Sequence, residues 1–148
     1  MRLEVIPHEQ EQPWTCLAAC LKMCLGALDV ELPEATIAAT CGTTPAGTSL
    51  EQAADGLKAL GFAGDIYDPV DVDWLFDRLA LGEPVIVSLH AGLAAGRPIR
   101  HAVVVSGADG GEITVADPAT GTERTLAEAE FCRMWSLAGG GALAVYRP

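Results

Sequence analysis

The chain has 148 residues, about the size of one domain, and half of them are hydrophobic while a fifth are charged. This composition is typical of a globular protein rather than a disordered one, and no window of about 18 apolar residues predicts a transmembrane helix. The formal net charge is −11, which argues against a nucleic-acid-binding protein, because phosphate binding requires clustered Lys and Arg side chains. The charge is compatible with a basic or neutral peptide as substrate.

The N-terminal segment up to Trp14 has neither a long apolar core nor a basic leader, so we expect no secretory signal and a cytoplasmic protein. The chain shows no internal repeat and no linker, and we therefore expect a single domain over residues 1–148. Its five cysteines are odd in number and lack the spacing of a disulfide framework, which favours reduced thiols.

The first half of the chain is predicted to be mainly helical. A short extended segment, Leu3–Ile6, precedes Pro7. The predicted helices are Trp14–Leu28, with apolar residues at most positions, Pro33–Ala39, a helix capped by Thr48 or Ser49 that runs to Leu60, and a helix capped by Asp71 that runs to Leu81. Gly61 and Gly82 follow the last two helices and are expected to end them.

The second half changes to the period of a β-sheet. The expected elements are strands Pro84–Leu89, His101–Ser106 and Glu112–Ala116, a hairpin turn at 109–111, a helix from a Thr125/Glu128 capping box to about Trp135, and a closing strand Ala142–Tyr146. Helices followed by antiparallel strands predict an α+β fold.

Cys16 falls in the first turn of the first predicted helix. The helix dipole and the free N–H groups there favour an anion, and such a position lowers a thiol pKa below its usual value of about 8.5. The same N–H groups help to hold an oxyanion. Gln10 and Gln12 lie just upstream, and a glutamine side-chain amide is a candidate second oxyanion donor.

His101 begins a strand, and Asp117 follows sixteen residues later at the end of the next one. Counting outward from the hairpin turn places these two residues at roughly the same level, so an acceptor can reach one imidazole nitrogen while the other faces Cys16. This is the geometry of a Cys-His-Asp triad. His90 is the alternative base, whereas His8 is expected to be a loop residue.

Each of these residues also has a purely structural explanation. Cysteine is often a small buried hydrophobe, and we expect Cys20, Cys24 and Cys132 in the core and Cys41 at a helix end. Asp117 before Pro118 fits an ordinary turn. The C-x₃-C-x₃-C stripe does not match the usual zinc spacings, so no metal and no cofactor are expected. Two arginines in the predicted loop 91–100 are candidates to contact an acidic part of a substrate.

The segment Gln10–Cys20 resembles the start of the bacteriocin-processing, double-glycine-leader cysteine peptidases, a branch of the papain-like superfamily. That family has a glutamine six residues before its nucleophilic cysteine, which is the spacing of Gln10 to Cys16; Gln12 is the weaker match. Further segments resemble the family's later strands, its aspartate turn and its closing elements: Gly82–Val87, His101–Gly107, Val115–Gly121, Glu130-Phe131 and Trp135.

The resemblance implies a papain-like fold with N-terminal helices on a C-terminal antiparallel sheet, and a peptide or protein substrate. It also implies a nucleophile (Cys16), a general base (His101), an orienting carboxylate (Asp117) and an oxyanion donor (Gln10). The family commonly has Asp-Cys-Gly at the nucleophile, where this chain has Thr15-Cys16-Leu17.

The best-known family members are domains of membrane ABC exporters, but these 148 residues contain no membrane segment and no Walker A motif. A stand-alone peptidase acting on another peptide or isopeptide is therefore an equal expectation. The alternatives from other classes are a thiol acyltransferase, an inactive peptide-binding module of the same fold, and a partner-binding protein with an accidental triad.

Overall fold

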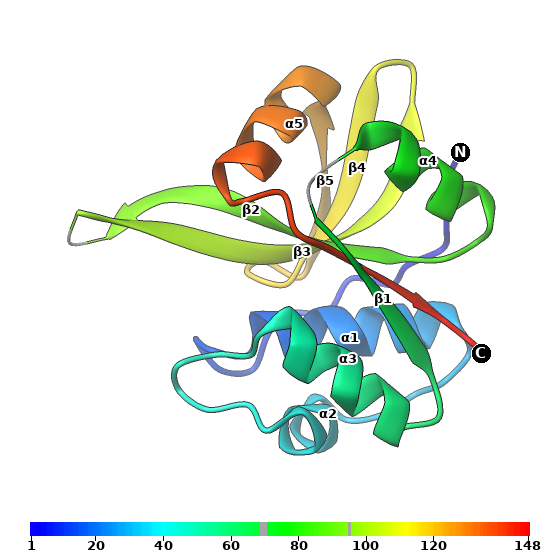
Figure 1. Ribbon diagram of the computed structural model, residues 1–148, viewed down its shortest axis with the longest axis vertical. Coiled ribbons are helices and arrows are strands. Elements are labelled where there is room, and N and C mark those ends of the chain that lie inside the picture. The colour runs from blue at the N-terminus through cyan, green and yellow to red at the C-terminus, as the bar shows by residue number, and fades with distance from the viewer. Residues whose placement is uncertain (69–70, 95) are drawn as a thin grey trace.

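A six-stranded antiparallel sheet crosses the middle of the molecule, with helices on both of its faces (Figure 1). The structure, a computed structural model, describes residues 1–68, 71–94 and 96–148. The strand order is β1 (Ala63–Tyr67), β6 (Ala142–Tyr146), β2 (Val85–Ala94), β3 (Arg97–Asp109), β4 (Glu112–Asp117) and β5 (Thr122–Ala127). The α+β fold expected from the sequence is confirmed.

The helices are α1 (Cys16–Ala27), α2 (Glu34–Cys41), α3 (Leu50–Ala59), α4 (Val72–Ala80) and α5 (Glu128–Leu137). Two of the predicted caps are present in the structure. Ser49, rather than Thr48, caps α3 in a full capping box with Gln52, and Asp71 accepts the N–H of Asp73 at the start of α4. None of the helices in the described part of the chain combines the length and hydropathy needed to cross a membrane.

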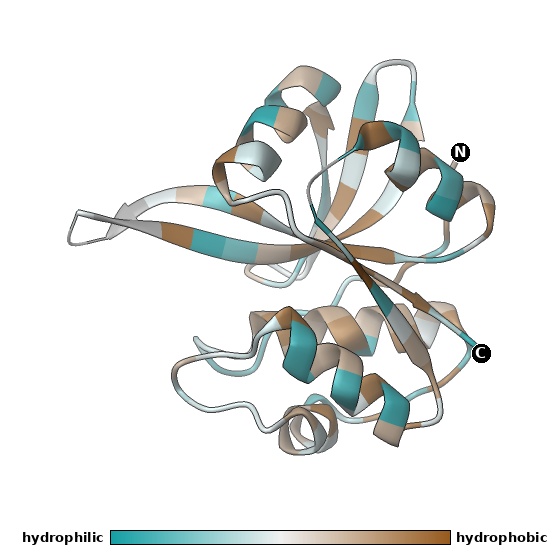
Figure 2. Cartoon of the chain, viewed as in Figure 1, coloured by the Kyte–Doolittle hydropathy of each residue, from teal (hydrophilic) through white to brown (hydrophobic). Residues whose placement is uncertain are grey.

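The sheet separates two hydrophobic cores. Helices α1, α2 and α3 pack on one face, and α4 and α5 pack on the other (Figure 1). Strand residues alternate between the cores, as Val104 faces the first while Val103 and Val105 face the second. Figure 2 shows the hydrophobic colour concentrated where the strands cross and along α1, while α3 and α5 also carry hydrophilic residues.

Three predictions about the elements are wrong. The sequence does not predict strands β1 and β5, because both are edge strands that contain no fully buried side chain and so lack a hydrophobic alternation. The Thr125/Glu128 capping box does not form: Thr125 pairs with Thr114 inside the sheet, and α5 begins after Ala127 without a side-chain cap. Strands β2 and β3 also run through most of the segment 91–100, which was expected to be a loop.

The cysteines divide by their position in these layers. Cys20 and Cys24 are fully buried in the first core, and Cys41 ends α2 just before Gly42, which has a φ of +69°. Cys132 is only half-buried at the edge of the second core, since α5 lies on the surface of the molecule, so the prediction of a core position is corrected there.

Candidate active site

A cavity of about 510 Å³ opens between the helical layer and the sheet, and Cys16 lies in its wall. The N-terminal turns of α1 and α3 form one side, and strands β2 and β3 with the α5–β6 connection form the other. Several of the lining residues are small: Ser88, Ala102, Ala138, Gly139 and Gly141. The lining also contains charged residues of both signs: Glu51, Asp68 and Arg100.

Cys16 is the first residue of α1, as the sequence predicted to within the first turn. Burial alone raises the pKa of its thiol. A hydrogen bond with His101, backbone N–H groups of Ala102 and Leu17, and the charge of His101 oppose that effect, and the net pKa is lowered. By contrast, burial raises the pKa of Cys20 and of Cys24, so these two remain neutral thiols. Cys16 is thus the thiol of α1 that is poised to ionise.

His101 lies between Cys16 and Asp117. Its Nε2 is 2.6 Å from Oδ1 of Asp117, which leaves Nδ1 as the nitrogen for the hydrogen bond with the thiol. The bond with Cys16 raises the pKa of the imidazole, burial lowers it, Asp117 raises it, and the net direction is upward. The raised pKa favours the protonated imidazole, which is the form that stabilises a neighbouring thiolate.

Asp117 is the last residue of β4 and is almost fully buried. Burial raises the pKa of its carboxyl group, but the hydrogen bonds from His101 and from the N–H of Ala119, together with the charges of His101 and Arg124, lower it overall. The predicted level pairing with His101 is only approximate. The β3–β4 register pairs Val104 with Ala116, so Asp117 reaches His101 diagonally.

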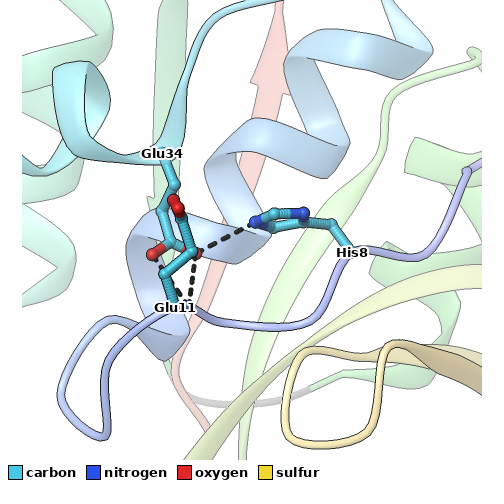
Figure 3. A group of neighbouring side chains, drawn as sticks. All are labelled: His8, Glu11 and Glu34. Atoms are coloured by element: carbon cyan, nitrogen blue, oxygen red, sulfur yellow. Dashed lines mark hydrogen bonds and ion pairs between the residues drawn. The ribbon is translucent and has the colours of Figure 1, made fainter.

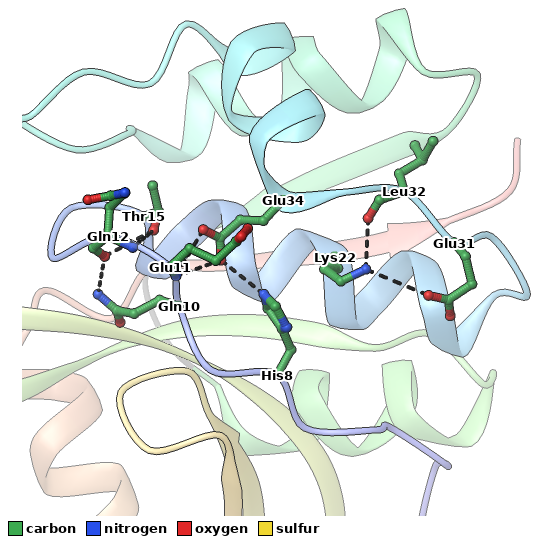
Figure 4. A network of polar contacts seen from close by, with 9 residues as sticks. All are labelled: His8, Gln10, Glu11, Gln12, Thr15, Lys22, Glu31, Leu32 and Glu34. Carbon is green, nitrogen blue, oxygen red and sulfur yellow. Dashed lines mark hydrogen bonds and ion pairs between the residues drawn. The ribbon is translucent and has the colours of Figure 1, made fainter.

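Gln10 lies beside His101, in a surface pocket that also includes Gln12 and Ala119. Its side-chain Nε2 donates to the carbonyl oxygen of Gln12 at 2.8 Å (Figure 4). An amide NH₂ group carries two hydrogens, so one of them is left for another acceptor. Gln12 is held differently, since its N–H donates to the hydroxyl of Thr15, which in turn donates to the Gln12 carbonyl.

Arg124 was missed by the sequence analysis. Its Nε donates to Oδ2 of Asp117 at 3.1 Å, on the side of the carboxylate opposite His101. Arg124 lies on β5, where it pairs with Val115. Recognition of β5 and of the turn after Asp117 would have been the signal, because a hairpin brings Arg124 back alongside the carboxylate.

We expect Arg124→Met to slow peptide hydrolysis by about two- to fivefold, since an ion pair with a half-exposed arginine has a modest energy. The pKa of Asp117 should rise when the guanidinium is removed, so activity should be lost at a higher pH on the acid side of the pH–rate profile. The matched control is Arg133→Met, which removes an exposed ion pair with Glu130 on α5. If the acid side of the pH–rate profile were identical in the two variants, Arg124 would not influence the ionisation of Asp117.

The other histidines lie elsewhere. His90 accepts the N–H of Gly92 through Nδ1, and His8 is in the N-terminal segment, where its Nε2 contacts Glu34. Of the two arginines in the segment 91–100, Arg100 is exposed and lines the cavity, whereas the side chain of Arg97 lies outside the described residues. The structure therefore brings Cys16, His101 and Asp117 together and places Gln10 beside His101, whereas His90 and His8 make other contacts.

A helical layer with a cysteine at the start of its first helix, docked on an antiparallel sheet that carries the histidine, is the papain-like cysteine peptidase fold. The chain belongs to the peptidase C39 family, whose model matches residues 5–145.

Solved structures of this fold are similar over nearly the whole chain. The peptidase domain of Streptococcus ComA, an ABC transporter involved in quorum sensing, has a TM-score of 0.79 at 20% identity, covering 98% of this chain and 100% of that one. A double-glycine-motif protease from an AMS/PCAT transporter, solved with its leader peptide, gives a TM-score of 0.80 at 21% identity, with 99% and 94% covered.

A protein described as a C39-like peptidase from Bacillus anthracis gives a TM-score of 0.76 at 15% identity, with 97% and 95% covered. No curated protein sequence matches the chain.

Proposed function

We propose that this protein is a cysteine peptidase in which Cys16, His101 and Asp117 act together. The observation that carries the proposal is the continuous chain of contacts from the Cys16 thiol through His101 to the buried Asp117, at the wall of an open cavity. The directions of the three pKa shifts agree with it, since a lowered thiol and a raised imidazole pKa favour the thiolate–imidazolium pair.

The thiolate of Cys16 attacks the carbonyl carbon of the scissile amide, and the C–O π electrons move to the oxygen. Two donors are proposed for that oxyanion. One is the N–H of Cys16, which has no partner within α1 because Cys16 is the first residue of the helix, and the other is the side-chain amide of Gln10, which lies beside His101. His101 then gives its proton to the leaving amine, and the C–N bond breaks. Water hydrolyses the thioester, with His101 as base.

The proposed substrate is a peptide with a double-glycine leader. Membership of the peptidase C39 family supports it, as does the likeness to a double-glycine-motif protease that was solved with a leader peptide.

We expect a synthetic peptide, made of a leader that ends in Gly-Gly and several residues that follow it, to be cut after the second glycine, with the site identified by mass spectrometry. The same peptide with Val in place of each glycine should not be cut, and Cys16→Ala protein is the control for contaminating activity. Cleavage of the Val peptide at a similar rate would refute double-glycine specificity, while the absence of Cys16-dependent cleavage across a peptide library would refute the peptidase.

A further inference from the structure

Glu34, the first residue of α2, carries a carboxylate that is only 2% exposed and that the proposed mechanism does not use. A buried carboxylate is costly unless hydrogen bonds compensate for its lost hydration. The partners of Glu34 lie in the segment before α1. Its Oε2 accepts the backbone N–H of Glu11 at 3.0 Å, and its Oε1 lies 3.1 Å from Nε2 of His8 and 3.3 Å from the same N–H (Figure 3).

The side chains of His8, Glu11 and Glu34 lie close enough together to resemble a metal site. The hydrogen bonds give a different explanation for the cluster. Both oxygens of Glu34 accept the backbone N–H of Glu11, and an N–H group is a donor that cannot serve as a metal ligand. One of the two oxygens also faces the ring nitrogen of His8. The carboxylate therefore serves as an acceptor that fixes the main chain at Glu11.

The same segment is held from its other side by the turn that follows Asp117. The N–H of Gln10 donates to the carbonyl oxygen of Pro118 at 2.8 Å. Gly121 packs tightly against Glu9, since a Cβ at Gly121 would lie 3.0 Å from the Cβ of Glu9 and 3.1 Å from its nitrogen. Gln10 thus lies in a short stretch of chain that is fixed between α2 and the β4–β5 turn (Figure 4).

We propose that Glu34 is a positioning residue that holds the Gln10 amide where it can stabilise the oxyanion; the inference rests on the peptidase function proposed above. Gln10 and Glu11 are adjacent, so an anchor on the Glu11 N–H restricts the backbone from which the Gln10 side chain extends. Glu34 is not among the groups that lower the Cys16 pKa, which are His101 and the N–H groups of Ala102 and Leu17. Glu34 should therefore affect the step in which the oxyanion forms and leave the thiolate unchanged.

The rates of peptide hydrolysis and of Cys16 alkylation distinguish an effect on the oxyanion from an effect on the thiolate. Hydrolysis of the synthetic double-glycine leader peptide needs the oxyanion donors, whereas alkylation of Cys16 by iodoacetamide needs only the thiolate. For Glu34→Ala we expect kcat to fall by about 10- to 100-fold, which is less than the roughly 10²- to 10³-fold seen when an oxyanion donor is removed, because Gln10 would be displaced but still present. KM should change by less than about threefold. The alkylation rate should stay within about twofold of wild type. Glu34→Gln should retain most of kcat, because its amide oxygen still accepts the Glu11 N–H.

The coupling to Gln10 is tested by a double-mutant cycle. If Glu34 acts through Gln10, Glu34→Ala should slow the wild type but have little further effect in a Gln10→Ala background. Multiplicative losses in kcat, or an equal loss of hydrolysis and alkylation in Glu34→Ala, would overturn the inference. If Glu34→Ala does not fold, Glu34→Asp takes its place in both assays, since it keeps the charge but withdraws the acceptor by one methylene group.

The cycle also distinguishes the two proposals. A slow Gln10→Ala enzyme without coupling to Glu34 would leave the peptidase mechanism intact and overturn only the role of Glu34. A Gln10→Ala enzyme with unchanged kcat would remove Gln10 from the mechanism and Glu34 with it. If the wild-type protein shows no Cys16-dependent cleavage, the proposed peptidase function itself is refuted.

Discussion

Cys16→Ala is expected to abolish hydrolysis of the leader peptide, with kcat reduced by at least about 10⁴-fold, because loss of a nucleophile removes the covalent pathway and leaves only binding and oxyanion stabilisation. The fold should survive the change. Cys16 is half-buried at the edge of the first core, and the substitution removes a single sulfur atom. Peptide cleavage would be followed by mass spectrometry, and folding by thermal unfolding.

The matched control is Cys132→Ala, which removes another half-buried thiol, located on α5 away from the cavity. Wild-type turnover is expected for this variant. If Cys16→Ala retained turnover, or if both variants lost it to the same extent, Cys16 would not be the nucleophile. Binding of the leader peptide by Cys16→Ala without any cleavage would be consistent with the peptidase, because the cavity remains.

His101→Ala is expected to change the pH at which Cys16 becomes reactive. In the wild type the net effect of the surroundings lowers the thiol pKa, so iodoacetamide should alkylate Cys16 at a lower pH than an ordinary thiol, whose pKa is about 8.5. Without His101, burial still raises the pKa while the hydrogen bond and the charge that lower it are gone. Alkylation at pH 6.5 should then fall by at least about tenfold and recover only above about pH 8.5.

The directions of the two pKa shifts, downward for Cys16 and upward for His101, also predict the shape of the pH–rate profile. The thiolate–imidazolium pair forms as pH rises past the lowered pKa of Cys16 and is lost as pH passes the raised pKa of His101, so kcat/KM should be bell-shaped with two pKa values that belong to the pair. His90→Ala is the matched control, and its alkylation profile should be that of the wild type. A shift in His90→Ala and none in His101→Ala would identify His90 as the base.

Much of the site could be predicted from the sequence because its main parts are local. Cys16 is placed by the start of one helix, and His101 and Asp117 are placed by one hairpin with a clear turn signal. Arg124 could not be placed, because β5 is an exposed edge strand whose side chains have no hydrophobic alternation. The contact of His8 with Glu34 joins residues 26 positions apart, and no local pattern encodes such a contact.

The helix boundaries show the same division between local and tertiary control. Ser49 and Gln52 form a capping box that sequence rules describe, whereas the similar pattern at Thr125 and Glu128 is overridden by the backbone pairing of β5 with β4. A capping motif therefore predicts a helix start only where no neighbouring strand competes for the same backbone groups.

The division of the site between two layers has a consequence for how activity arises. Cys16 is carried by the helical layer, while His101 and Asp117 are carried by the sheet. An incompletely folded chain would hold Cys16 as an ordinary thiol, because His101 reaches it only after the layers have docked. Partial opening between the layers, well short of global unfolding, would have the same effect. If Cys16 is the nucleophile, as proposed, its activation depends on completed folding, and an incompletely folded chain would be unable to cleave neighbouring chains.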